Sequence, residues 1–424
     1  MLILSVSVKL KKYKQKIKMK LIEYLGNQLL KIFFGLFILL SNQLFAQVEL
    51  TSEMMEEYAF RFSIDKDNNL NKEAQEKWIF FIGENQFLGL AEIHRSTQKS
   101  IFTDAILDVL KGKGFDNFAL EVGPNSADIL SEFSNSDNFK GEIRTLNRQY
   151  GRRNKPPIIF VNKKQDAVFI QKAFDLKYNI WGLDQEFVYA PEMLLDRLYG
   201  LQENPTNSQK AYYEEAKKII KKYRFRNKVR GTNLSCWYQS NQIINSCLDA
   251  LGGTPEADKI ISDLRESWDI YCKSATGKGS DQQRANYMKQ NFESYYRSQE
   301  ESKPKVFLKL GSAHLTRGIS PFKVDDLGKF LTEKAVKNET GFLSIRQMVA
   351  YRNGKSLIGK SGWESVGMFL ELGKMDKWTV VDLRPLREKL IKGLIKTNEK
   401  YTFEILSYDL LLLPPNDSFD KVNY

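Results

Sequence analysis

The sequence predicts an α/β protein with a mostly parallel central sheet, helices on both faces and a helical insertion. The first observation that supports this fold class is a strand–helix–strand unit. Residues 87–94 and 118–121 are short apolar strands, and the segment between them has the spacing of an amphipathic helix. Such a unit pairs its strands in parallel through a right-handed crossover. The second observation is that the unit repeats, and the third is a long stretch without strand signals from about residue 190 to 302.

Each element of the predicted sheet has a local signature. The helix after the first strand ends at Gly112 and Gly114, and its apolar face is formed by Ile101, Phe102, Ala105, Ile106, Val109 and Leu110. In the second unit, Pro156 and Pro157 introduce a strand at 158–161, which is followed by a helix at 164–177 and a strand at 180–184. Strand signals return later at residues 306–310, 342–345, 378–382 and 401–413.

The insertion at about 190–302 is predicted to be helical throughout. Its apolar periodicity indicates four helices, near residues 206–223, 237–250, 256–271 and 281–299. Residues 47–78 are polar and mixed, which is typical of a lead-in of helix and loop. We therefore expect a single α/β domain over residues 79–424, with the insertion placed between the halves of the sheet.

Residues 1–46 have the pattern of a signal peptide. Six lysines between residues 9 and 18 precede Lys31 and the apolar run 32–40, and Ala46 offers a small residue at the cleavage site. A start of translation at Met19 would give a leader of more ordinary length. The run is too short to span a bilayer, which needs about 20 residues. The mature protein is predicted to be exported, periplasmic or extracellular, without stable membrane insertion; the alternative is an uncleaved helix on the membrane surface.

Charge and cysteine content narrow the function classes further. The net charge is +12, but residues 1–46 hold eight lysines and one glutamate, so the leader carries more than half of it. Nucleic-acid binding therefore has little support from composition. The three cysteines, Cys236, Cys247 and Cys272, lie in the insertion without a CxxC motif, which argues against zinc there. Export permits one disulfide, but the sequence leaves its pairing open.

Four predicted strands end on polar residues that can carry chemistry. These are Glu92 with His94, then Glu121, Asp184 and His314, and the two histidines are the only ones in the chain. Because the carboxyl ends of parallel strands meet at one edge of a sheet, we expect these side chains to share one site that takes a small-molecule substrate. A neutral imidazole can deprotonate water near neutral pH. The same set, with His94, His314 and Glu121 as ligands, could instead hold a divalent metal.

The motifs resemble the erythromycin esterase, ChaN and Tiki superfamily. The resemblance covers roughly residues 80 to 413 and rests on short motifs: Glu92-Ile93-His94, Ala119-Leu120-Glu121, Gly182-Leu183-Asp184, Arg284-x-x-x-Met288-x-x-Asn291, Leu310-Gly311-Ser312-Ala313-His314 and Tyr408-Asp409. It departs from the esterase branch in two ways: Glu92 stands two residues before His94 instead of three, and Ala91 replaces a glycine. Both departures argue against a macrolide substrate.

The resemblance implies an α/β fold and a hydrolase that activates water. His94 would be the general base, Glu121 its partner, and Arg284 and His314 would orient substrate or stabilise negative charge. The alternatives that it leaves open are a metal-dependent Tiki-like hydrolase or protease, and a non-enzymatic ChaN-like protein that binds haem or metal with help from a tyrosine such as Tyr150.

The sequence gives little support to two other functions, nucleotide binding and serine hydrolase activity. Residues 354–361 fit the P-loop pattern, but no strand leads directly into them and Gly362 is a poor start for a helix. No G-x-S-x-G elbow exists, which excludes a serine hydrolase of the α/β-hydrolase type.

Overall fold

The computed structural model describes residues 18–20, 25–26, 28–31, 47–151, 155–161, 163–226 and 232–418. Most of the predicted signal peptide, residues 1–46, lies outside the described residues. Within the described ranges, no helix has both the length and the apolarity that crossing a membrane requires.

The chain divides into two compact units. The smaller unit comprises Met1–Leu50 and Leu386–Asn398 and contains a two-stranded parallel pair, β1 (Val48–Glu49) with β11 (Ile395–Lys396). The larger unit comprises Thr51–Pro385 and Glu399–Tyr424, and it holds the central sheet and all the candidate site residues.

The central sheet has eight strands in the order β2-β10-β12-β7-β3-β6-β4-β5. The six strands from β12 to β5 in this order run parallel to one another, whereas β10 is antiparallel to both β2 and β12. The predicted α/β class with a mostly parallel sheet is therefore confirmed. The strands are β2 (Ala59–Phe62), β3 (Asn85–Glu92), β4 (Phe115–Leu120), β5 (Asn179–Gly182), β6 (Lys305–Gly311), β7 (Gly341–Gln347), β10 (Trp378–Asp382) and β12 (Leu410–Leu413).

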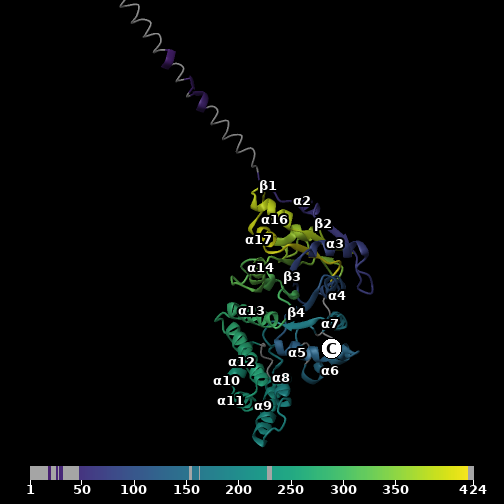
Figure 1. Ribbon diagram of the computed structural model, residues 1–424, viewed down its shortest axis with the longest axis vertical. Helices are drawn as coiled ribbons and strands as arrows, with labels where there is room; N and C mark the ends of the chain where they lie inside the picture. Colours follow the sequence, from purple (N-terminus) through teal and green to yellow (C-terminus); the bar gives the residue numbers. More distant parts are fainter. Residues whose placement is uncertain are drawn as a thin grey trace, which may run out of the picture. The chain divides into compact units, whose positions relative to one another are not determined.

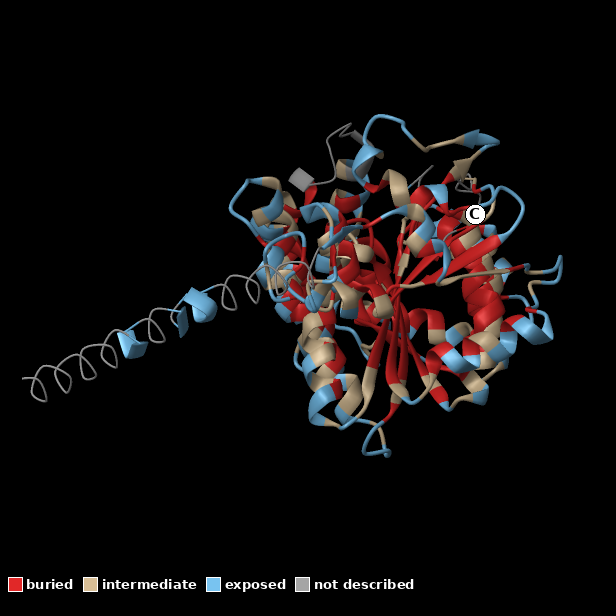
Figure 2. Ribbon diagram, turned by 90° about the horizontal axis from the view of Figure 1, so that it is seen from above, coloured by how far each residue is buried: buried red, intermediate tan, exposed pale blue. Residues whose placement is uncertain are grey.

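Helices cover both faces of this sheet (Figures 1 and 2). Before the insertion they are α2 (Ser52–Glu56), α3 (Lys72–Ile82), α4 (Thr97–Gly112), α5 (Pro124–Glu132), α6 (Phe139–Tyr150) and α7 (Lys164–Asp175). After it come α14 (Leu327–Lys337), α15 (Gly367–Glu371) and α17 (Glu399–Ser407), whereas most of α16 (Arg384–Ile391) belongs to the smaller unit. The strands are red in Figure 2, which marks them as the buried centre of the molecule.

The insertion between β5 and β6 contains six helices among the described residues, and α9–α12 lie together at one end of the larger unit (Figure 1). They are α8 (Pro191–Gly200), α9 (Asn207–Arg226), α10 (Thr232–Ser240), α11 (Gln242–Leu251), α12 (Pro255–Ala275) and α13 (Asp281–Arg297). A disulfide between Cys236 and Cys272 joins α10 to α12, and Cys247 is a buried free thiol.

Aromatic side chains pack each layer of helices onto its own face of the sheet. On one face, Phe102 of α4 contacts Trp378, and Phe169 of α7 contacts Phe118. On the other face, Phe292 of α13 packs edge-on against Phe87 and Trp181. Because side chains alternate between the faces of a strand, α13 of the insertion is held directly against the back of the sheet.

Two strand predictions were wrong. Residues 158–161 form a loop and not a strand, since Pro156 and Pro157 have no N–H to donate and Phe160 has a φ of 65°, in the left-handed region. Residues 399–407 form α17, with Tyr401 and Ile405 buried one helical turn apart, and only 410–413 form a strand. The edge strand β2 lies in the region predicted as helix and loop.

Residues 354–361, which fit the P-loop pattern, form part of a hairpin and turns. Strand β8 (Tyr351–Arg352) pairs antiparallel with β9 (Lys355–Ser356), and no helix begins at Gly359. The backbone N–H groups needed to cradle phosphates are therefore not presented by a helix start.

Candidate functional site

The four strands that carry the predicted site residues are neighbours in the sheet. Strands β3, β6, β4 and β5 lie side by side and parallel, so their carboxyl ends form one continuous edge. His94, His314, Glu121 and Asp184 follow these four strands directly. The structure brings all four side chains together, and the edge of a parallel sheet is where such proteins bind ligands.

His94 is held through its Nδ1 atom by Glu92. Nδ1 lies 3.0 Å from Glu92 Oε1, whereas Nε2 lies 4.0 Å from Glu121 Oε2 and is beyond hydrogen-bond distance. The direct partner of His94 is therefore Glu92 and not Glu121, because residues two apart at a strand end point to the same side. The His94 side chain is 41% exposed, while that of Glu92 is buried. The ring of Phe160 stacks on the imidazole with centroids 4.3 Å apart.

Glu92 is surrounded by two buried lysines. Lys99 of α4 donates to Oε1 at 2.8 Å, and Lys309 of β6 lies 2.5 Å from Oε2. Burial opposes ionisation of Glu92, but the charges of Lys309 and Lys99 and the hydrogen bond with His94 hold the pKa of the carboxyl well below its usual range. Glu92 is therefore an anion and can only accept the proton of His94 Nδ1.

Glu121 occupies the centre of the site. Its Oε2 accepts a hydrogen bond from the N–H of Gly311 at 2.5 Å, and its Oε1 accepts one from Arg284 Nη2 at 3.0 Å. The Nε2 atoms of His94 and His314 lie 4.0 and 3.8 Å from its two oxygens. A Cβ on Gly311 would stand 3.0 Å from the His94 ring and 3.2 Å from Glu121, so these side chains would have to move by a few tenths of an ångström to admit it.

Arg284 connects the helical insertion to the sheet edge. It lies in the first turn of α13 and forms a two-pronged pair with Asp184, with Nε 2.9 Å from Oδ1 and Nη2 2.6 Å from Oδ2. On the same face of the helix, Asn291 donates to the carbonyl of Leu183 at 2.9 Å. Burial raises the pKa of Asp184, but Arg284 outweighs it and holds that pKa below its usual value.

His314 has its own carboxylate partner on the opposite side of the site. Its Nδ1 lies 2.9 Å from Oδ2 of Asp326, the residue that caps α14. Burial lowers the pKa of His314, but the bond to Asp326 and the charges of Glu121 and Asp326 together outweigh it and leave the pKa raised. Protonation is therefore favoured, and in the imidazolium form Nε2 carries a proton that it can donate.

Comparison with solved structures shows which known folds the chain is similar to. A mutant of the erythromycin esterase EreC in its open conformation superposes with a TM-score of 0.54 at 14% identity, over 86% of this chain and 99% of that one. A succinoglycan biosynthesis protein gives a TM-score of 0.54 at 15% identity, and a protein from Bacillus cereus gives 0.51 at 14%; both alignments cover 88% of this chain and 98% of the other. The chain has the erythromycin-esterase fold. This confirms, at the level of the fold, the resemblance predicted from the sequence.

No family model and no curated protein matches this sequence. At such low identity the shared erythromycin-esterase fold does not transfer a substrate or a reaction. The chemistry therefore has to be argued from the side chains themselves.

The described residues at this edge of the sheet can be compared with the requirements of a metal site. Among the described residues, no three of His, Cys, Asp and Glu converge in a way that would hold a metal ion. The guanidinium of Arg284 already lies between Glu121 and Asp184, and its charge would repel a divalent cation at that place. Tyr150, the tyrosine considered for haem, donates its hydroxyl to Asp196 at 2.9 Å and is committed to that bond.

Several residues of the site were not identified from the sequence. They are Lys99, Lys309, Asp326 and the ring of Phe160. For Lys309 a signal existed, since a single charged residue stands inside the apolar run 306–310, and a buried strand admits a lysine only when it is paired. Asp326 and Phe160 lie in loops, where the sequence carries no comparable pattern.

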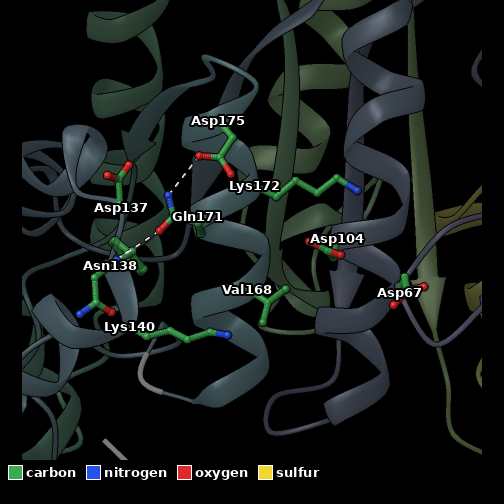
Figure 3. Close-up of a pocket in the computed structure, with 10 residues that line it drawn as sticks. Asp67, Asp104, Asp137, Asn138, Lys140, Val168, Gln171, Lys172 and Asp175 are labelled. Atoms are coloured by element: carbon green, nitrogen blue, oxygen red, sulfur yellow. Dashed lines mark hydrogen bonds between the residues drawn. The ribbon is translucent and has the colours of Figure 1, made fainter.

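A separate pocket of about 360 Å³ lies between α4 and α7, away from this edge of the sheet (Figure 3). It is lined by Asp67, Asp104, Asp137, Asn138, Phe139, Lys140, Val168, Gln171, Lys172 and Asp175. None of the predicted site residues contributes to it. Four aspartates and two lysines line it, and Gln171 donates a hydrogen bond to Asp175 at 3.1 Å.

Proposed function

We propose that the chain is an exported hydrolase in which His94 activates water against an ester or a related acyl bond. The observation that carries this proposal is the orientation of His94. Its Nδ1 is engaged by an anionic Glu92, so the lone pair of the neutral ring is on Nε2, which lies 4.0 Å from Oε2 of Glu121. A half-exposed imidazole with its far nitrogen fixed has the arrangement of a general base.

The proposed reaction is the hydrolysis of an acyl bond, with His94 and His314 acting on water and substrate. His94 Nε2 takes a proton from a water molecule, and the oxygen of that water attacks the carbonyl carbon of the substrate. The tetrahedral oxyanion accepts a hydrogen bond from protonated His314 Nε2. Collapse of the intermediate breaks the bond between the acyl carbon and the leaving oxygen, and the proton on His94 passes to that oxygen.

The remaining charges keep the two imidazoles in place. Glu121 lies between them and is itself fixed by hydrogen bonds from Gly311 and Arg284. Arg284 is in turn fixed by Asp184. Glu121, Arg284 and Asp184 are therefore assigned to holding the site's geometry and charge, while His94 and His314 act on the substrate.

Export is supported by the leader sequence and by the disulfide. A Cys236–Cys272 bond persists in oxidising compartments and is rare in the cytosol. The localisation part of the proposal is tested by expressing the full chain and sequencing the N-terminus of the secreted product, for which a start at Gln47 is expected.

The activity is tested on the mature chain with panels of esters, lactones and peptides. Turnover is expected on at least one ester or lactone, to survive a chelator, and to fall by about 1,000-fold in His94→Ala, since loss of a general base costs roughly that much. Retained circular dichroism and thermal stability in the variant would show that the loss is chemical. Turnover that disappears with chelator would favour the metal-dependent alternative, and a Soret band after haem addition would favour the binding protein. No turnover across all panels would contradict the proposal.

A further inference from the structure

The carboxylate behind His94 is held by two lysines inside the protein. Lys99 is 1% exposed and Lys309 is 2% exposed, and both reach Glu92, which is itself 3% exposed. The two lysines come from different elements, α4 and β6, and approach different oxygens of the carboxylate at 2.8 and 2.5 Å. Lysines are almost never fully buried unless they are paired, so two on one carboxylate need an explanation.

The surrounding groups balance this cluster electrically. Asp166, in the first turn of α7, is buried and acts on both lysines, while it accepts a bond from Ser100 Oγ at 2.7 Å. The ring of Phe169 lies 5.0 Å from Lys309 Nζ, and the ring of Phe160 lies 6.0 Å from Lys99 Nζ. The two lysines are thus balanced by the carboxylates of Glu92 and Asp166, and an aromatic ring lies near each ammonium group.

The state of Glu92 decides which nitrogen of His94 carries the proton. An ionised Glu92 can only accept, so Nδ1 must be the donor and Nε2 of the neutral ring is bare. A protonated Glu92 could donate to Nδ1, and the ring proton would then sit on Nε2, where the ring could no longer take a proton from water. Burial by itself favours the protonated form.

We propose that Lys99 and Lys309 are positioning residues that hold Glu92 as an anionic acceptor and thereby keep Nε2 of His94 free of a proton. The inference rests on the proposed function for its purpose, since a bare Nε2 matters only if His94 is a base. Neither lysine is assigned to contact with substrate, because both ammonium groups are buried and turned toward Glu92.

The composition of the chain makes the proton on His94 directly observable. The protein contains only two histidines, so ¹⁵N-histidine labelling gives two rings, and long-range ¹H–¹⁵N spectra distinguish a ring protonated on Nδ1, on Nε2 or on both. His94→Ala assigns the spectrum by removing one set of signals. In the unchanged mature chain, the neutral form of the His94 ring is expected to carry its proton on Nδ1.

The variant Lys309→Met removes one ammonium with little change in volume. Glu92 then has one lysine, and the negative charge left in the cluster is relieved by taking up a proton, either on His94 or on Glu92 itself. Both routes lower the population of His94 with a bare Nε2, by at least about twofold. Lys309→Arg, which restores the charge, is expected to recover the original pattern in part. Lys305→Met is the matched control, since Lys305 lies at the far end of the same strand and donates to the carbonyl of Lys113.

Two results would overturn the proposal. One is a His94 ring in the unchanged chain with its proton on Nε2, which needs no variant and so does not depend on folding. The other is a folded Lys309→Met protein whose His94 signals match the original. If no hydrolysis is found but the labelled rings behave as expected, the proposed function fails and the positioning role stands. If hydrolysis is found and Lys309→Met leaves both His94 and turnover unchanged, only the positioning role fails.

Discussion

Gly311 and His94 lie so close that a side chain on the glycine would press on the imidazole. A Cβ built on Gly311 would stand 3.0 Å from both Cε1 and Nε2 of the ring, and the N–H of the same glycine donates to Glu121 at 2.5 Å. The glycine therefore leaves Nε2 of His94 without a crowding neighbour on this side, while its backbone fixes Glu121.

Gly311→Ala is expected to reduce hydrolysis strongly while the fold persists. The added methyl group presses on the His94 ring and the Glu121 carboxylate, which must move by a few tenths of an ångström. Since a misplacement of about 1 Å can cost roughly 100-fold in rate, a loss of about tenfold is expected. Steady-state kinetics and thermal unfolding on the same sample measure both effects. Gly200→Ala is the control, because nothing lies within 4 Å of a Cβ at that position. An alanine variant with unchanged rate would show that the site tolerates a shift of His94.

Arg284→Met is expected to destabilise the protein by about 3 kcal/mol, since it leaves the buried Glu121 and Asp184 without their shared cation. Urea unfolding of the two proteins measures the difference. In the control, Arg265→Met, an exposed pair with Asp249 is broken, and a change below about 1 kcal/mol is expected. Equal effects of the two substitutions would mean that Arg284 contributes no more than a surface ion pair.

The free energy of unfolding is expected to depend on Glu186. This carboxyl is buried at the start of α5, where Ser126 Oγ donates to it at 2.5 Å, and burial raises its pKa from 4.5 to about 7. Between about pH 4.5 and 7 the folded state holds a proton that the unfolded state has released, so stability falls as pH rises through this window, by about 3 kcal/mol in all.

Glu186→Gln is expected to remove this part of the pH dependence. The measurement is urea unfolding at several pH values for the original chain and the variant, and the difference between the two curves isolates Glu186 from other carboxyls. The exposed Glu203→Gln serves as the control. Parallel curves for the original chain and Glu186→Gln would show that Glu186 keeps an ordinary pKa in the folded protein.

The disulfide is expected to contribute roughly 3 to 4 kcal/mol, because it closes a loop with a sequence separation of 36 residues. Unfolding with and without reductant measures this contribution, and the double variant Cys236→Ser/Cys272→Ser should be insensitive to reductant. Thiol counting in denaturant gives an independent check. One reactive thiol, that of Cys247, is expected without reductant and three with it. Three thiols in the untreated protein would mean that the bond does not form.

The parts of the fold that were predictable are those with local signals. Apolar runs that end on a polar residue identified the strand ends at His94, Glu121, Asp184 and His314, since a buried parallel strand needs continuous apolar side chains. Helix periodicity identified α13 and its face with Arg284 and Asn291. Residues 401–407 were predicted as strand but form helix, because apolar residues in so short a segment fit both the strand period of 2 and the helix period of 3.6.

The contacts of the site depend on distances between segments that are remote in the chain. Glu92 and Glu121 were both candidates for the partner of His94, and only the direction of the side chains after β3 decides for Glu92. Lys309 meets Glu92 across two paired strands, a pairing that no local pattern specifies. The disulfide likewise follows from the packing of α10 on α12, which brings two of the three cysteines together.

The position of Arg284 limits how much of the helical insertion can be exchanged. The insertion looks like an exchangeable cap, but its last helix supplies the cation that neutralises two carboxylates on the sheet. A chimera that replaces residues 190–302 as one block would remove that cation. The carboxylates of Glu121 and Asp184 would then repel each other at the edge of the sheet. Grafts limited to α9–α11 that keep Cys236 for its disulfide with Cys272, with α12 and α13 retained, would vary the insertion without removing that cation.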